Sequence, residues 1–134
     1  MNISSYSDLL KAARAQPEPQ RLLFVFTRAE LPEAPTARQQ LNFEANQGGE
    51  LVPVMCVDKL PEEVAQFAAL VEESRQTGQD WDIVFIASLP GRAGTVPSSD
   101  EAEQPLYMMV DAIKQGRISS FLAFDREGEV VSFF

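Results

Sequence analysis

The chain contains no histidine. This absence excludes the Ser-His-Asp and Cys-His arrangements that activate a nucleophile, and it removes the usual ligand of zinc sites. It also removes the side chain that most often serves as a general base near neutral pH. Any catalysis would therefore depend on carboxylates, lysine, arginine, tyrosine or a single thiol. No catalytic arrangement of these groups is recognisable in the sequence.

Cysteine and long apolar runs are also scarce. Cys56 is the only cysteine, so an internal disulfide is excluded, which is typical of a reducing compartment. No apolar run reaches the roughly 18 residues that cross a bilayer. The first residues carry no basic group ahead of an apolar stretch, so a signal peptide is not expected either. We expect a cytoplasmic protein that does not bind a membrane.

Basic residues are outnumbered, with 11 Lys and Arg against 20 Asp and Glu and a net charge of −9. Such a surface repels phosphate backbones and anionic lipid heads, so nucleic acid and membranes are not expected partners. The apolar content of 45% against 23% charged residues is typical of a globular chain rather than a disordered one. At 134 residues, we expect one domain over 1–134 with a real hydrophobic core.

Hydrophobic spacing predicts helices that alternate with short strands. Apolar residues at helical spacing predict a first helix, capped by Ser4 or Ser5 and ending before Pro17. Short apolar runs between turn residues predict strands, and Pro53 belongs at the start of its strand or on an edge because it cannot donate to a ladder. The predicted strands are 21–26, 54–57 and 81–89, and the later helices are 37–47, 61–79 and 105–116.

This alternation of strands and helices implies parallel crossover connections. The sequence therefore predicts an α/β fold, a three-layer sandwich with a mostly parallel or mixed sheet of about five strands. Alternating apolar segments around the turn 125–128 predict a C-terminal β-hairpin that adds an antiparallel edge. Phe133 and Phe134 end this hairpin and could either close the core or form an exposed edge. The second alternative predicts a homodimer through the C-terminal edge.

Cys56 lies in the apolar run 53–57, "PVMCV". Its large apolar neighbours predict a buried thiol that packs as a small hydrophobe. No second cysteine is present to resolve an oxidised intermediate, and no histidine is present to activate the thiol. A redox role for Cys56 is the alternative.

Three basic residues, Arg28, Lys59 and Arg92, follow the three predicted strands at short distance. If the strands are parallel neighbours, their carboxyl ends share the sheet edge where ligands bind in open α/β sheets. The cations would then suit a phosphate or carboxylate group, with Ser88 and Asp58 completing the predicted ligand-binding set. The alternative is that all of these are ordinary solvated strand ends, since "GRAG" has neither the P-loop nor the dinucleotide-binding glycine spacing.

Three stretches resemble a family of small proteobacterial proteins: "LVPVMCVDK", "FAALVEESRQTGQDW" and "AIKQGRISSFLAFDREGE". The similarity extends over nearly the whole chain, and members often carry the label "ribonucleotide reductase subunit alpha". That enzyme subunit is a large barrel with several cysteines for radical chemistry and re-reduction, which 134 residues with one cysteine do not hold. The resemblance therefore implies a bacterial cytoplasmic setting and assigns no catalytic residue.

Two hypotheses of function follow. The first is a non-catalytic, acidic cytoplasmic protein that binds another protein and needs no cofactor or metal. It rests on the absence of histidine and of a catalytic arrangement. The second is a protein, or an enzyme, that binds a small anion through the loops after its strands. It requires Arg28, Lys59 and Arg92 to converge in one pocket.

Overall fold

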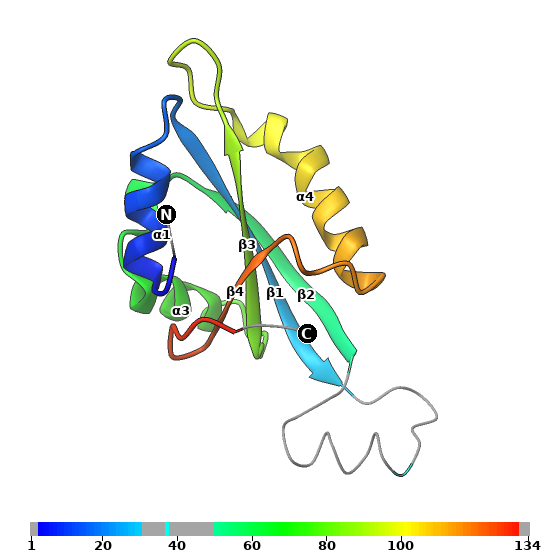
Figure 1. Ribbon diagram of the computed structural model, residues 1–134. Coiled ribbons are helices and arrows are strands. Elements are labelled where there is room, and N and C mark those ends of the chain that lie inside the picture. Colours follow the sequence, from blue (N-terminus) through cyan, green and yellow to red (C-terminus); the bar gives the residue numbers. More distant parts are fainter. Residues whose placement is uncertain (1–2, 31–36, 38–49, 132–134) are drawn as a thin grey trace.

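The computed structural model describes residues 3–30, 37 and 50–131, which contain one open sheet (Figure 1). Within these residues, four strands lie in the order β2-β1-β3-β4, and each neighbouring pair is antiparallel. β1 and β3 are therefore central, whereas β2 and β4 lie at the two ends. The strands span Gln20–Glu30 (β1), Glu50–Lys59 (β2), Ile83–Pro90 (β3) and Leu122–Asp125 (β4).

β1 is the centre of the hydrophobic core because apolar residues occupy both of its faces. Leu22, Phe24 and Phe26 belong to one buried cluster. Leu23 and Val25 belong to a second cluster on the other face, and all five side chains are almost fully buried. Successive strand residues point to opposite faces, so a continuous apolar run suits a strand that is covered on both sides.

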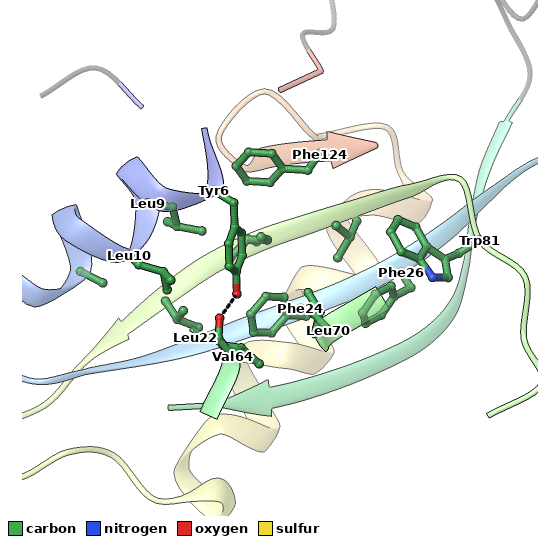
Figure 2. Packing of buried hydrophobic residues seen from close by; sticks show 13 residues of the cluster. Tyr6, Leu9, Leu10, Leu22, Phe24, Phe26, Val64, Leu70, Trp81 and Phe124 are labelled. Atoms are coloured by element: carbon green, nitrogen blue, oxygen red, sulfur yellow. Dashed lines mark hydrogen bonds between the residues drawn. The ribbon is translucent and has the colours of Figure 1, made fainter. Parts of the chain in front are cut away.

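α1, the 3₁₀ helix η1 and α3 cover the first face of the sheet. The ring of Tyr6 packs edge-on against Phe67 and Phe124, with ring centroids 5.1 Å and 6.0 Å apart. Its hydroxyl donates a 2.6 Å hydrogen bond to the carbonyl of Val64, as Figure 2 shows. One buried tyrosine thus ties α1 to η1, α3 and β4. These helices span Tyr6–Arg14 (α1), Pro61–Val64 (η1) and Phe67–Arg75 (α3).

α4 (Ser99–Lys114) covers the second face. It begins with a capping box: the Ser98 hydroxyl accepts from the Glu101 N–H, and the Glu101 carboxylate accepts from the Ser98 N–H. Pro105 lies inside the helix, where its missing N–H removes one backbone hydrogen bond. The side chains that α4 buries against the sheet are Ala102, Leu106, Met109 and Ile113.

After β4 a tight turn brings the chain back along that strand. The Asp125 carboxylate accepts two backbone N–H bonds inside the turn, of 2.9 Å and 3.0 Å. Beyond the turn, Val130 bridges Phe124 in antiparallel fashion. Up to residue 131, where the described part of the chain ends, the hairpin consists of the short strand β4 and this bridge. Phe133 and Phe134, which were expected to end it, lie outside the described residues.

The predicted three-layer sandwich with a mostly parallel or mixed sheet of about five strands is wrong, because the described residues form a sheet of four strands in which every neighbouring pair is antiparallel. β2 and β3 point the same way, but β1 lies between them, so the crossover through η1 and α3 skips one strand position. β3 and β4 pair antiparallel although α4 separates them in the sequence. A helix between two strands is thus compatible with either direction of pairing.

The first helix is predicted correctly, since α1 follows the N-cap Ser5 and ends before Pro17. The single helix expected over 61–79 is instead two pieces, η1 and α3, because Gln66 between them is extended. The apolar spacing of this segment predicts that Val64, Phe67, Ala68 and Val71 face the core. Val64 is buried and Phe67 and Val71 pack against the core, whereas Ala68 is exposed and Leu70 is buried in its place.

Other boundaries also move. The helix expected from Pro105 begins earlier, at Ser99, and the strand expected over 54–57 extends in both directions with Pro53 inside it. The helix expected over 37–47 lies outside the described residues except for its first position. Within the described part of the chain, no helix combines the length and apolar character needed to cross a membrane.

Candidate functional site

The antiparallel sheet separates Arg28 from the other residues that are predicted to bind an anion. Arg28, near the end of β1, pairs with Val52 near the start of β2, whereas Lys59 at the end of β2 pairs with Leu22. The stretch of β1 between Leu22 and Arg28 is about 20 Å long. Arg28 instead forms an ion pair with Glu30, whose Oε1 is 3.2 Å from the arginine Nε. The three cations therefore do not converge, because that arrangement requires parallel strands.

Lys59 and Ser88 lie in one row across the sheet, on the face covered by α1 and α3. Both pair with Leu22, one on each side of β1. The Nζ of Lys59 is 2.7 Å from Oε1 of Glu73 on α3. The Ser88 hydroxyl donates a 2.6 Å hydrogen bond to the side-chain oxygen of Gln20. Each residue has its own protein partner, and these contacts do not point to a shared ligand.

Asp58 points to the opposite face, where it forms an ion pair with Arg21. Oδ2 of Asp58 is 2.6 Å from Nη1 of Arg21, and the side chains are only 18% and 12% exposed. The Ser99 hydroxyl donates to the same Oδ2 at 2.7 Å, and Arg21 Nε donates to the Pro97 carbonyl at 2.6 Å. These bonds fasten the start of α4 to β1 and β2. Asp58 therefore serves as a cross-link between elements.

The loop after β3 begins with a tight turn that carries Arg92. Arg92 and Thr95 exchange two backbone hydrogen bonds of 3.0 Å and 2.9 Å. Between them, Ala93 and Gly94 both have positive φ, which is the signature of a type I′ turn. Before the turn, Gly91 passes so close to Thr95 that a Cβ would lie 2.1 Å from its carbonyl oxygen. Only glycine fits at that position.

A cavity of about 230 Å³ lies between this turn and the start of α4. Its lining includes Arg92 and Glu101, and the Glu101 carboxylate accepts the N–H of Ser98. Arg92 is the one basic residue of this lining, so it is the group that could attract an anion. Ligand pockets usually measure about 300–1,000 Å³, so this cavity suits a small anion rather than a nucleotide. Of the five predicted ligand-binding residues, it includes only Arg92.

β2 is the sheet edge that the described residues leave open. β1 pairs with one side of β2, and no described strand pairs with the other side. At the far end of the sheet, by contrast, Val130 bridges the outer side of β4. All side chains from Leu51 to Val57 are partly or fully exposed. Pro53 and the bulge at Val54 interrupt the ladder and so protect the first part of this edge, whereas Met55, Cys56 and Val57 form a regularly paired apolar stretch after them.

The predicted burial of Cys56 is wrong, since its side chain is exposed. Cys56 pairs with Val25 and lies on the face that α4 covers, but β2 is the outermost strand. Apolar neighbours in the sequence do not ensure burial there, because an edge strand has a neighbouring strand on one side only. The thiol is therefore accessible from solvent.

Sequence reasoning missed Arg21, Ser99 and the adjacent pair Tyr107 and Met108. Arg21 and Ser99 lie far apart in the chain, and no local pattern links them to Asp58. Tyr107 and Met108 are exposed on α4. Their exposure could have been predicted from the sequence. Helical spacing places the neighbouring Leu106 and Met109 on the side of α4 that faces the sheet, and it leaves these two residues on the solvent side.

Among the described residues, no group of three or more His, Cys, Asp or Glu could hold a metal ion. Comparison with family models, with curated proteins and with solved structures finds no match for this chain. The resemblance to small proteobacterial proteins is not tested by these comparisons and stays a prediction.

Proposed function

We propose that this protein is non-catalytic and binds another protein, which adds a strand to the outer edge of β2. The observation that supports the proposal is the open edge itself. β2 has ten residues and is apolar between its charged ends. Among the described residues, it is paired on one side only. Long apolar edges are pairing sites unless they are covered, charged or bent.

Strand addition would use two features of β2. The free backbone N–H and C=O groups of an edge form a ladder with an incoming strand, which gives affinity. Val54, Met55 and Val57 pack partly against the core, and the side chains of that strand would cover the part of each that is still exposed. Completing the burial of each side chain contributes about 1 kcal/mol to the free energy of binding. The ladder and the side chains together favour an extended peptide segment as the ligand.

Charge and thiol chemistry favour a protein partner in the cytoplasm. The net charge of −9 disfavours nucleic acid and anionic lipid surfaces. The accessible Cys56 suits a reducing compartment, because in an oxidising one it would form disulfides between chains. The predicted homodimer through the C-terminal edge is a separate proposal, which requires Phe133 and Phe134 to be exposed.

The test blocks the edge without disturbing the core. Cys56→Lys introduces a charge of the kind that protects natural sheet edges, and Cys56→Ser is the matched control. The wild type and the two variants each serve as bait in a pull-down experiment. We expect the wild type and Cys56→Ser to capture the same partner, and Cys56→Lys to fail to capture it. Capture of the same partner by all three would contradict the proposal. So would a turnover that is abolished by substituting one polar residue of the cavity.

Binding of a small anion at the cavity is the second candidate, supported by Arg92 in its lining. A thermal-shift screen against phosphate- and carboxylate-bearing metabolites tests it, since a ligand at 100 times its Kd adds about 2.7 kcal/mol. A stabilising ligand should lose its effect in Arg92→Ala and keep it in Arg28→Ala, because Arg28 lies at the opposite end of β1. Equal loss in both variants would exclude this site.

A further inference from the structure

Tyr107 and Met108 form an apolar patch on the solvent side of α4. Their side chains are 72% and 61% exposed, and no other large hydrophobic side chain among the described residues is exposed. They lie between Leu106 and Met109, which face the sheet. Two adjacent apolar side chains in water are unfavourable, because the hydrophobic effect favours covering them. The position of the patch on a regular helix makes it a fixed surface.

Carboxylates flank this patch. Glu103 lies one helical turn before Tyr107 and Asp111 one turn after it, so both are neighbours of its ring. α4 as a whole carries four carboxylates against one lysine. The carboxylate of Glu103 has no hydrogen-bond or ion-pair partner in the described part of the chain. Asp111 accepts a 2.9 Å hydrogen bond from Gln115 and forms an ion pair with Arg117, whose Nη2 is 4.0 Å from its Oδ2. Because both side chains of this pair are more than half exposed, the pair is weak and Asp111 can exchange it for a cation of a partner.

We propose that this face of α4, defined by Glu103, Tyr107, Met108 and Asp111, binds a basic amphipathic segment of a partner protein. Lysine or arginine of that segment pairs with the two carboxylates, and a cation over the Tyr107 ring gains a cation–π contact. Apolar side chains of the segment cover Met108, whose unbranched thioether adapts to the shape it meets. The surface is separate from the edge of β2 and goes beyond the strand-addition proposal.

Charge complementarity selects this occupant over the others. Two copies of the chain packed through α4 would bring Glu103 and Asp111 against the same carboxylates of the second copy, which is repulsive. Nucleic acid and anionic membranes are repelled by the same carboxylates and by the net charge of −9. A basic protein segment satisfies the charges and covers the apolar pair.

The test titrates the full chain into a fluorescently labelled amphipathic helical peptide of leucine and lysine, and measures fluorescence anisotropy. The variants are Tyr107→Ser combined with Met108→Ser, and Glu103→Lys. The matched control is Glu62→Lys, which makes the same charge change at an exposed residue of η1. We expect the double variant to bind about tenfold more weakly. Glu103→Lys should lose about fivefold in affinity, and Glu62→Lys less than twofold.

Equal losses in Glu103→Lys and Glu62→Lys would overturn the proposal, because they indicate general attraction to an acidic protein. Unchanged affinity in the double variant would overturn it too. Sedimentation that shows a dimer abolished by the double variant would assign the face to a second copy instead. Circular dichroism should show the same fold in every variant, since the substituted side chains are exposed. Cys56→Lys should bind the peptide normally, so failure here is distinguishable from failure of strand addition at β2.

Discussion

Ala93 has a backbone conformation that suits asparagine or glycine better than alanine. Its φ of 50° is in the left-handed region, which costs alanine about 1 kcal/mol. We predict that Ala93→Asn raises the free energy of unfolding by about 0.5–1 kcal/mol, because asparagine is favoured at this turn position. Urea denaturation measures the change. The control Ala68→Asn, on the exposed side of α3, should lower stability slightly. A loss of stability in Ala93→Asn would contradict the argument.

Burial raises the pKa of the Tyr6 phenol well above its usual value. The folded state therefore keeps the proton that the unfolded chain loses near pH 10. The resulting stability is fully present below about pH 10 and is lost as the pH rises above that value. We predict that the wild type loses more unfolding free energy than Tyr6→Phe between about pH 9 and 11. Equal losses would contradict this role for Tyr6.

The same substitution tests the hydrogen bond from Tyr6 to the carbonyl of Val64. Near pH 7 we expect Tyr6→Phe to cost about 1–2 kcal/mol, because a buried acceptor loses its donor. Both effects follow from the burial of Tyr6, and urea denaturation at several pH values separates them.

Single residues that end elements are the part of the fold that sequence predicts best. Ser5 caps α1 as expected, and the helix expected to end at Gly116 ends with Gln115 as C-cap, directly before this positive-φ glycine. These outcomes depend on the local backbone alone. Cys56 was predicted wrongly because its exposure depends on whether another strand covers β2, which no neighbour in the sequence specifies.

At the scale of elements, the Arg21–Asp58 pair joins β1, β2 and the start of α4. We predict that Arg21→Ala lowers the free energy of unfolding by about 2–4 kcal/mol, because it leaves a largely buried carboxylate without its cation. Arg28→Ala should cost less than about 0.5 kcal/mol, because the Arg28–Glu30 pair is about half exposed. Urea denaturation of the two variants makes the comparison.

A second variant separates a pair effect from lost packing. Arg21→Met combined with Asp58→Leu should be more stable than Arg21→Ala, since no charge is left unpaired. The argument fails if the double variant is the less stable of the two.

Element boundaries were predicted less well than caps, because local signals conflict. The capping box of α4 is present in the sequence, yet Pro105 favours a helix start at its own position. Core packing of Ala102 before the proline decides in favour of the earlier start. The network around Asp58 could not be predicted at all, since its members meet only after the strands pair antiparallel.

At the scale of the whole molecule, the sequence predicts most of the order of helices and strands, but it does not predict the directions in which the strands pair. Apolar runs fix which residues are buried on both faces, as in β1. They do not fix whether a neighbour runs parallel or antiparallel, because the same side chains face the same layers in either case. The anion-site hypothesis depended on strand direction, and the antiparallel sheet therefore leaves Arg92 apart from Arg28. Hypotheses based on composition, such as an acidic binding protein, do not depend on topology.

The open edge of the sheet makes a prediction for the whole molecule that requires no known partner. In an antiparallel ladder, alternate N–H groups of an edge strand point to its neighbour and the rest point to solvent. We predict that amides of β1 exchange most slowly with deuterium, because β1 is hydrogen-bonded on both sides. Amides over 54–58 of β2 should alternate between slow and fast exchange. NMR-detected hydrogen exchange on the isolated chain measures both patterns.

Uniformly slow exchange over 54–58 would mean that the outer side of β2 is already covered, and strand addition would then be excluded. Uniformly fast exchange would mean that β2 does not hold its pairing with β1, so it could not act as a template. An alternating pattern whose fast amides slow down when a protein partner is added would locate the bound strand. Only this third result is compatible with a rigid edge that binds by extending the sheet.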